Sequence, residues 1–222
     1  MSLHLPSMKS VVVLTLASWA IAASAQDVRA VARAVDEHYN RLRSLQAEFT
    51  ESFRGAGVER TETGTLWLKK PGKMRWEYRS PREKLFVSDG RDAWFYLPSD
   101  RQVRKTGVKK LDDLRSPLAL MLGKTKLEKE LDGLSLAPDQ KASVTGNVIL
   151  RGRPQALADR VSEVLLEITP GSQIARIQIE QSDGSTTEYR FSDQKENVDV
   201  SDSRFHFVAP AGVETVEGDF GQ

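Results

Sequence analysis

The sequence predicts a mainly β fold, in which an antiparallel sheet of about ten or eleven strands is covered by two helices. Stretches of alternating apolar and polar residues follow one another from residue 45 to residue 191, separated by turn-forming Gly, Pro, Asp and Ser. One amphipathic helix precedes them and a short apolar helix interrupts them. An open sheet of that size leaves a face unpacked, and strand twist favours curling it into a full or partial barrel. The helices can then cover its mouth.

The first 25 residues have the composition of a secretory signal peptide. Lys9 is their only charged residue, residues 11–23 are almost wholly apolar, and Ala23-Ser24-Ala25 is a small-x-small cleavage signal. The apolar run is shorter than the ~20 residues that span a bilayer. We therefore expect an exported, soluble chain that begins near Gln26 and forms a single domain over residues 26–222.

Composition excludes several classes of protein. The 32 basic and 31 acidic residues nearly balance, whereas proteins that bind nucleic acid carry a strong basic excess. The chain has no cysteine, which is consistent with a bacterial periplasmic protein whose core needs no disulfides. Without a cysteine, the mature N-terminus also cannot carry a lipid anchor. We expect a monomer that does not bind nucleic acid.

The mature chain begins with a predicted helix over residues 27–44. Asp27 is its candidate N-cap. Its apolar residues recur at spacings of three and four and share one face: Val28, Val31, Val35, Tyr39 and Leu42. At Leu45 the period changes to two, which predicts that a strand follows directly.

The predicted strands fall between recurring turn signals. The strongest hairpin signal is Asp89-Gly90, because both residues tolerate the positive φ of a tight turn. Further strands are predicted over residues 63–69, 73–78, 84–88, 93–97, 102–108, 143–150, 161–169, 174–180 and 186–191.

A short helix is predicted over residues 111–122, between two groups of strands. Ser116 and Pro117 fit its N-cap and first helical position, and Gly123 fits its end. Its apolar residues lie on several sides, so it suits a position between the sheet and solvent.

No signature of catalysis or metal binding is present. Beyond the signal peptide the only histidines are His38 and His206, and neither lies in a metal or triad motif. His206 is expected to face solvent. Gly123-Lys124-Thr125 resembles the end of a phosphate-binding loop, but Leu118 stands where the first glycine is required. We therefore predict no enzymatic activity, no cofactor and no metal.

Two groups of side chains are candidates for binding. Trp67, Met74 and Trp76 lie on two successive strands, and such residues form either a filled core or a pocket for a hydrophobic guest. The sequence leaves both open. A basic run could dock an acidic protein partner or keep an edge strand soluble. It comprises Arg101, Arg104, Lys105, Lys109 and Lys110.

Several blocks spread over nearly the whole mature chain resemble the LolA family of periplasmic lipoprotein carriers. They are LQAEFT at residues 45–50, GTLWLKKPGKMRW at 64–76, VSDG at 87–90 with WFY at 94–96, SPL at 116–118, and FHF at 205–207. The resemblance implies a half-open antiparallel β-barrel with an α-helical lid. It also implies a carrier that receives the acyl chains of lipoproteins from an inner-membrane ABC-type release complex and delivers them to a LolB-like outer-membrane receptor.

The resemblance also assigns roles to individual residues. In the family, a basic residue before the proline of the second block hydrogen-bonds backbone carbonyls of the lid. Here this residue is Lys70, where the family usually has arginine. Trp67, Met74 and Trp76 would then form the cavity wall or rim, and Leu118, Met121 and Leu122 the lid underside. The alternative is a periplasmic lipid- or lipoprotein-sensing regulatory module of the same fold.

Overall fold

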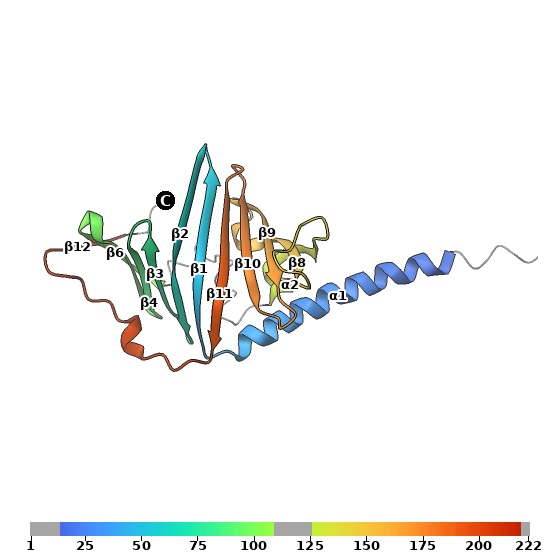
Figure 1. Ribbon diagram of the computed structural model, residues 1–222, viewed down its shortest axis with the longest axis horizontal. Helices are drawn as coiled ribbons and strands as arrows, with labels where there is room; N and C mark the ends of the chain where they lie inside the picture. Colours follow the sequence, from blue (N-terminus) through green and yellow to red (C-terminus); the bar gives the residue numbers. More distant parts are fainter. Residues whose placement is uncertain (1–13, 109–125, 219–222) are drawn as a thin grey trace, which may run out of the picture.

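The computed structural model describes residues 14–108 and 126–218, and a single 12-stranded sheet dominates it (Figure 1). The strand order is β12-β6-β5-β4-β3-β2-β1-β11-β10-β9-β8-β7, so β12 and β7 form two free edges and the sheet is open. All neighbours are antiparallel except β12 and β6, which are parallel. The half-open β architecture expected from the sequence is confirmed.

Ten of the twelve strands overlap segments that were predicted as strands. They are β1 Ser44–Gly55, β2 Val58–Lys69, β3 Lys73–Ser80, β4 Lys84–Asp89, β5 Asp92–Leu97, β6 Gln102–Gly107, β7 Leu131–Leu136, β8 Val148–Pro154, β9 Val161–Ile168, β10 Ile174–Gln181, β11 Thr186–Glu196 and β12 Glu214–Glu217. Because side chains alternate across each strand, the sheet has two chemically distinct faces.

Two strands were not predicted, and each lacks the alternating pattern. In β7 the pairing register shifts between Asp132 and Ser135, and Gly133 has a φ of 65°. This irregularity breaks the period of two. The four residues of β12 lie in the acidic C-terminal region and are mostly exposed, so they carry no apolar signal.

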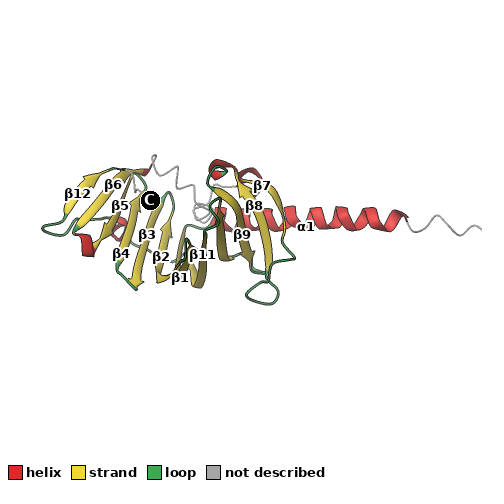
Figure 2. Cartoon of the chain, turned by 90° about the horizontal axis from the view of Figure 1, so that it is seen from above, coloured by secondary structure: helices red, strands yellow, loops and turns green. Residues whose placement is uncertain are grey.

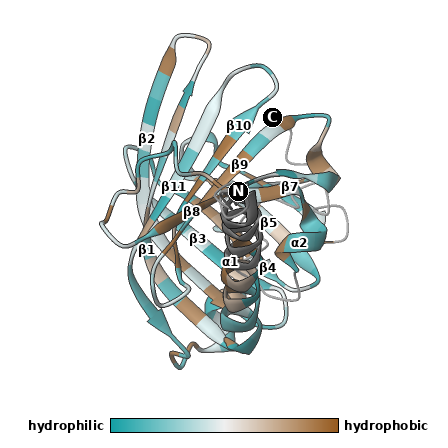
Figure 3. Ribbon diagram, turned by 90° about the vertical axis from the view of Figure 1, so that its right-hand side faces the viewer, coloured by the Kyte–Doolittle hydropathy of each residue, from teal (hydrophilic) through white to brown (hydrophobic). Residues whose placement is uncertain are grey.

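The two helices are α1 Leu14–Arg41 and α2 Leu127–Glu130. The part of α1 from Val28 onward and Leu127 of α2 pack on the concave face of the sheet, whereas the N-terminal part of α1 extends beyond the sheet (Figure 1). Figure 3 shows α1 end-on within the curve of the strands. The predicted apolar face is confirmed, because Val28, Val35, Tyr39 and Leu42 are all buried against the sheet. The helix begins earlier than predicted and ends three residues before Ser44, where β1 starts. The predicted helix at 111–122 lies outside the described residues.

The main core lies between α1 and the concave face. It joins α1 to side chains from β1, β2, β3, β7, β8, β9, β10 and β11: Leu45, Ala47, Phe49, Leu66, Leu68, Trp76, Leu131, Leu150, Val164, Leu166, Ile168, Ile174, Ile177 and Phe191. The hydroxyl of Tyr39 accepts a hydrogen bond from the backbone N–H of Ile174 at 2.9 Å, which satisfies this polar group inside the core. The C-terminal end of α1 is thereby fixed to β10.

The opposite, convex face of β1 to β5 is crossed by residues 197–208, here called the C-terminal strap. Figures 1 and 2 show this segment leaving β11 and passing along the outside of the sheet to β12. Phe205, in the short 3-10 helix Asp202–Phe205, is 1% exposed and packs with Val200 against Trp67. Phe207 reaches the rings of Trp94 and Tyr96 at centroid distances of 6.2 and 5.8 Å. The strap therefore covers a face that would otherwise expose aromatic side chains.

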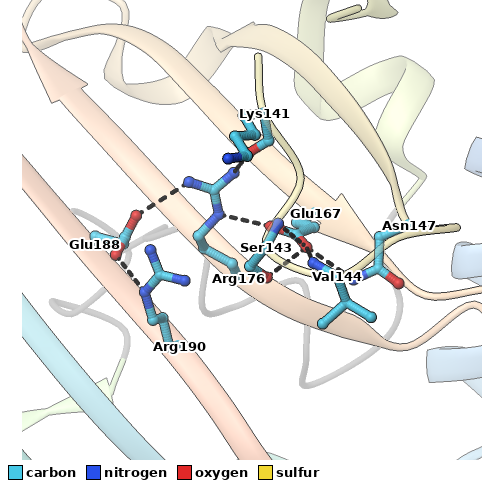
Figure 4. A network of polar contacts seen from close by, with 8 residues as sticks. All are labelled: Lys141, Ser143, Val144, Asn147, Glu167, Arg176, Glu188 and Arg190. Atoms are coloured by element: carbon cyan, nitrogen blue, oxygen red, sulfur yellow. Dashed lines mark hydrogen bonds and ion pairs between the residues drawn. The ribbon is translucent and has the colours of Figure 1, made fainter.

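A buried ion pair fixes residues 141–147 to the sheet (Figure 4). Glu167 is 0% exposed; one oxygen accepts from Arg176 Nε at 2.9 Å, and the other from Ser143 Oγ at 2.6 Å and Asn147 Nδ2 at 2.8 Å. Burial raises the pKa of the Glu167 carboxyl, but these hydrogen bonds and Arg176 outweigh it and hold the pKa below its ordinary value. Because these bonds occupy residues 143–147, the predicted strand at 143–150 starts only at Val148.

Candidate functional site

The concave face of β1, β3 and β11 carries a cluster of five aromatic rings. Phe49 lies edge-on to Trp76 and Tyr78, at centroid distances of 4.8 and 4.9 Å. Trp76 in turn contacts Tyr189 and Phe191 at 5.9 and 6.4 Å. Edge-to-face packing of this kind adds to the stability of an apolar surface beyond its buried area.

Around this cluster the concave face remains partly exposed. Side chains that pack against the main core but are only half-buried include Met74, Tyr78, Phe86, Ile179 and Tyr189. Phe95 on β5 pairs with Phe86 on β4 and is also half-buried. Large apolar side chains that are supported from below and open on one side form a surface suited to a hydrophobic guest.

A group of charged residues borders the aromatic surface. Glu51 on β1 lies directly opposite Glu62 on β2, and both are buried. The Tyr78 hydroxyl donates to Glu51 Oε2 at 2.7 Å, and Lys84 Nζ donates to Glu62 Oε2 at 2.5 Å. Burial raises the pKa of the Glu51 carboxyl above its ordinary value, although the hydrogen bond from Tyr78 opposes this shift.

This charged group was not predicted from the sequence, although the sequence contains a signal for it. Glu51 and Glu62 occupy positions in phase with the inward-facing residues Phe49 and Leu66 of their strands. A carboxylate where the alternation calls for an apolar residue indicates a buried polar site. Tyr189 and Phe191 were also not singled out, because strand order alone brings β11 beside β1.

Lys70 is the first residue of the β2–β3 turn and contacts α1. Its Nζ donates to the backbone carbonyls of Tyr39 at 2.5 Å and Asn40 at 3.0 Å. These carbonyls belong to the last turn of α1, where the helix dipole favours a cation. The Tyr39 carbonyl also accepts a hydrogen bond from the backbone N–H of Leu42 at 3.3 Å. The geometry is compatible with the latch role implied by the family resemblance.

The structure separates Trp67 from the other two predicted cavity residues. Met74 and Trp76 belong to the concave core, whereas Trp67 pairs with Arg75 and faces the convex side under Val200 and Phe205. The Arg204 guanidinium lies over the Trp67 ring at 4.4 Å. Trp67 thus contacts the strap and not the aromatic surface around Trp76. Leu118, Met121 and Leu122 lie outside the described residues.

A polar groove of about 500 Å³ lies between the strap and the sheet on the convex side. Its lining residues are Gln46, Trp67, Arg75, Asp199, Val200, Ser201, Ser203 and Arg204. The lining combines both signs of charge, because it includes Asp199 as well as two arginines.

The basic run does not form one surface. Arg101 and Arg104 are exposed, with Arg104 opposite Phe95 on the concave side. Lys105 faces the convex side, where it forms an ion pair with Asp92 at 3.0 Å and lies near the Trp94 ring. Lys109 and Lys110 lie outside the described residues. The run therefore points in at least two directions.

The histidines occupy separate places. His206 is exposed, as expected. His38 Nε2 lies 2.9 Å from Glu196 Oε1, which also accepts from Gln173. Across residues 14–108 and 126–218 there is no group of three or more His, Asp or Glu side chains positioned to hold a metal ion. Within the same residues, no helix is long and apolar enough to cross a membrane.

Comparisons with known proteins agree with this architecture. Residues 40–208 match the family model of the outer membrane lipoprotein carrier protein LolA. The outer-membrane lipoprotein carrier protein of Chromobacterium violaceum is 31% identical over 189 residues, which cover 80% of this chain and 82% of the relative. That of Nitrosospira multiformis is 28% identical over 179 residues, covering 78% and 82%.

Solved structures share the fold at much lower identity. An uncharacterized conserved protein from Thermus thermophilus has a TM-score of 0.56 at 14% identity, covering 88% of this chain and 99% of its own. The Mycobacterium tuberculosis lipoprotein LppX has a TM-score of 0.50 at 13% identity, covering 79% and 98%. With a family match over most of its length and carrier proteins as close relatives, this chain belongs to the LolA family of outer membrane lipoprotein carrier proteins.

Proposed function

We propose that the protein carries lipoproteins across the periplasm by holding their acyl chains against its concave face. The supporting observation is the half-buried apolar surface around Met74, Phe86 and Tyr189, backed by the aromatic cluster at Trp76. The relatives named outer-membrane lipoprotein carrier proteins support the choice of cargo.

The energetics of acyl chains explain why a carrier is required. Each buried methylene is worth roughly 0.8 kcal/mol, so a chain of about 14 methylenes costs on the order of 10 kcal/mol to hold in water. A surface that is half open can bind such chains and still release them, because less apolar area is removed from water than in a closed core.

In this proposal the cargo is received from an inner-membrane ABC-type release complex and passed to a LolB-like outer-membrane receptor. Lys70 acts as the latch that holds α1 near the β2–β3 turn, and Leu118, Met121 and Leu122 cover the acyl chains. The exposed Arg101 and Arg104 are candidate contacts for these partners, together with Lys105, Lys109 and Lys110. The mature chain is residues 26–222.

The test is release of lipoprotein from spheroplasts into the soluble fraction. Wild-type protein should appear there in a stable complex with acylated lipoprotein. Met74→Glu places a charge on the concave surface and should abolish loading without preventing folding, since Met74 is only half-buried. Val198→Glu, at a half-buried position on the convex side, is the matched control and should load normally.

The two possible failures have different meanings. Folded wild-type protein that releases no lipoprotein would contradict the carrier function and favour the lipid-sensing alternative. Equal loading by folded Met74→Glu and wild-type protein would contradict the concave face as the acyl site.

A further inference from the structure

The concave face is not apolar throughout, and Lys84 lies where its character changes. On β4 the inward-facing side chains are Lys84, Phe86 and Ser88. Lys84 pairs with Tyr78 of β3, and Phe86 pairs with Trp76. Lys84 therefore lies at the border of the aromatic cluster, opposite Tyr78 and one inward position beyond Phe86.

The surroundings of Lys84 hold its ammonium group in one place. Its Nζ donates to Glu62 at 2.5 Å and lies 4.2 Å from the centre of the Tyr78 ring. The Lys84 side chain is 16% exposed, so it is largely withdrawn from solvent but not fully buried. Both contacts restrict the orientation of a side chain that is otherwise flexible.

This arrangement leaves hydrogen-bonding capacity unused. A lysine ammonium has three donors. Among the described contacts of Lys84, Glu62 takes one donor and the Tyr78 ring faces the group. The neighbouring Glu62 carboxylate is also approached by Arg60 at 3.3 Å, so it does not depend on Lys84 alone. A ligand oxygen can therefore bind Lys84 without stripping Glu62 of its charge partners.

An acyl chain brings such an oxygen at its polar end. Every acyl group is joined to the lipid or lipoprotein that bears it through an ester or amide carbonyl. This carbonyl is a hydrogen-bond acceptor, whereas the rest of the chain is hydrocarbon. A carbonyl withdrawn from water without a donor is costly. A carrier protein that supplies a donor to this carbonyl lowers the cost. It therefore binds an acyl chain more tightly than a hydrocarbon of the same length.

We propose that Lys84 binds the carbonyl oxygens through which acyl chains are linked to the cargo, and that the chains run from there along the concave face toward α1. The inference rests on the proposed function and adds an orientation and a selectivity to it. The chain direction follows from the sheet, because the inward positions of β1 and β2 change from Glu51 and Glu62 to Phe49, Leu66 and Leu68 toward α1. The charged end of the face cannot cover hydrocarbon as the aromatic end does.

The test compares two lipids that differ only in their carbonyl groups. 1,2-Dioctanoylglycerol has two ester carbonyls, and 1,2-dioctylglycerol has ether linkages of the same chain length. Affinities are measured by displacement of the neutral fluorophore N-phenyl-1-naphthylamine from the mature protein. Wild-type protein should bind the diester about tenfold more tightly, as expected for one hydrogen bond to a charged group.

The decisive variant is Lys84→Met, which keeps an unbranched side chain one atom shorter and removes the donor. It should lose the preference for the diester while its affinity for the diether stays within about twofold. Lys105→Met is the matched control, because Lys105 is also ion-paired beside an aromatic ring but faces the convex side. It should keep the tenfold preference. If Lys84→Met does not fold, Lys84→Met/Glu62→Gln removes both charges and is measured instead.

The outcomes distinguish failure of the Lys84 assignment from failure of acyl binding itself. Equal binding of diester and diether by wild-type protein, or a preference that survives in Lys84→Met, overturns the role of Lys84 and leaves acyl binding intact. Failure of the wild-type protein to bind either lipid overturns acyl binding itself. A preference lost in Lys84→Met and kept in Lys105→Met supports the assignment, because a merely structural role would alter both affinities together.

Discussion

At the scale of single residues, Lys70 connects the sheet to the last turn of α1. Its two carbonyl contacts predict that Lys70→Met lowers the free energy of unfolding by about 1 kcal/mol and speeds amide exchange near the C-terminal end of α1. Lys70→Arg should keep both properties, since a guanidinium also donates to carbonyls. Urea unfolding and hydrogen exchange measure the two effects.

Lys69 provides the control for this prediction, because its side chain lies on the opposite, convex face of the sheet. Its Nζ donates to the Val200 carbonyl at 2.6 Å and pairs with Asp202 at 2.7 Å. Lys69→Met should therefore speed exchange in the strap and leave α1 unchanged. Faster exchange of the strap in Lys70→Met, with α1 unaffected, would contradict the assigned contacts.

Asp202 gives a prediction of pH dependence. Hydrogen bonds from Lys69 and Lys73, each at 2.7 Å, lower the pKa of the Asp202 carboxyl from 3.8 to about 2. A lowered pKa in the folded state means that the ion pairs stabilise the strap above pH 3.8, and that this contribution is lost as the pH falls through 2. NMR titration of the carboxyl should show the low midpoint.

The same titration, repeated on a variant without the two lysines, tests the cause of the lowered Asp202 pKa. In Lys69→Met/Lys73→Met the Asp202 midpoint should move back toward 3.8, because both cationic donors are removed. A midpoint near 3.8 in the wild-type protein would show that the two lysines do not hold Asp202 in solution.

At the scale of elements, the C-terminal strap replaces a second layer on the convex face. Phe205 is its main apolar anchor, so Phe205→Ala should lower the free energy of unfolding by about 3 kcal/mol, as expected for a large buried side chain. Val208→Ala, at a position 73% exposed, should change it by less than about 0.5 kcal/mol. Chemical denaturation measures both.

Lipid binding tests whether the C-terminal strap is independent of the concave face. Because Phe205 and Trp67 lie on the convex side, folded Phe205→Ala should bind 1,2-dioctanoylglycerol with wild-type affinity. A large loss of affinity in the folded variant would place the strap in the binding function and contradict the division of the two faces.

The pairing of elements also explains which strands the sequence revealed. Strands β1 to β6 and β9 to β11 were all predicted, since alternation and turn residues are local properties. Their ends were predicted less well, because β2 begins five residues before its predicted start and β11 ends five residues after its predicted end. The edge strands β7 and β12 were missed because an edge needs only one partner and tolerates a bulge or a charged surface.

At the scale of the whole molecule, the proposed mature chain should be a self-sufficient folding unit. The first described side chain of the core is Val28, and α1 contacts the sheet from there to Leu42. Removal of residues 1–25 should therefore change the melting temperature by no more than about 2 °C, measured by circular dichroism. A loss of cooperative unfolding would contradict residues 26–222 as the domain.

Chain order and spatial order differ most around β1. Hydrogen bonds join Arg43 to Asn197 and Ser44 to Val198, across 154 residues of sequence. These hydrogen bonds hold the end of β11 beside the start of β1. From there the strap continues along the convex face of the sheet. It also brings Tyr189 and Phe191 to Trp76, so the aromatic site is assembled from both halves of the chain.

The sequence by itself determined the local elements, the buried face of α1 and the family, because periodicity, turn residues and motif blocks are written in neighbouring residues. Together with the family resemblance it also predicted Trp67, Met74 and Trp76 as the cavity wall or rim and Lys70 as a latch. Only the tertiary structure decided that Trp67 faces the strap and that Glu51, Glu62 and Lys84 border the aromatic surface of the concave face. Which side of a strand becomes concave depends on sheet curvature and on distant segments that cover each face, and no single strand encodes these.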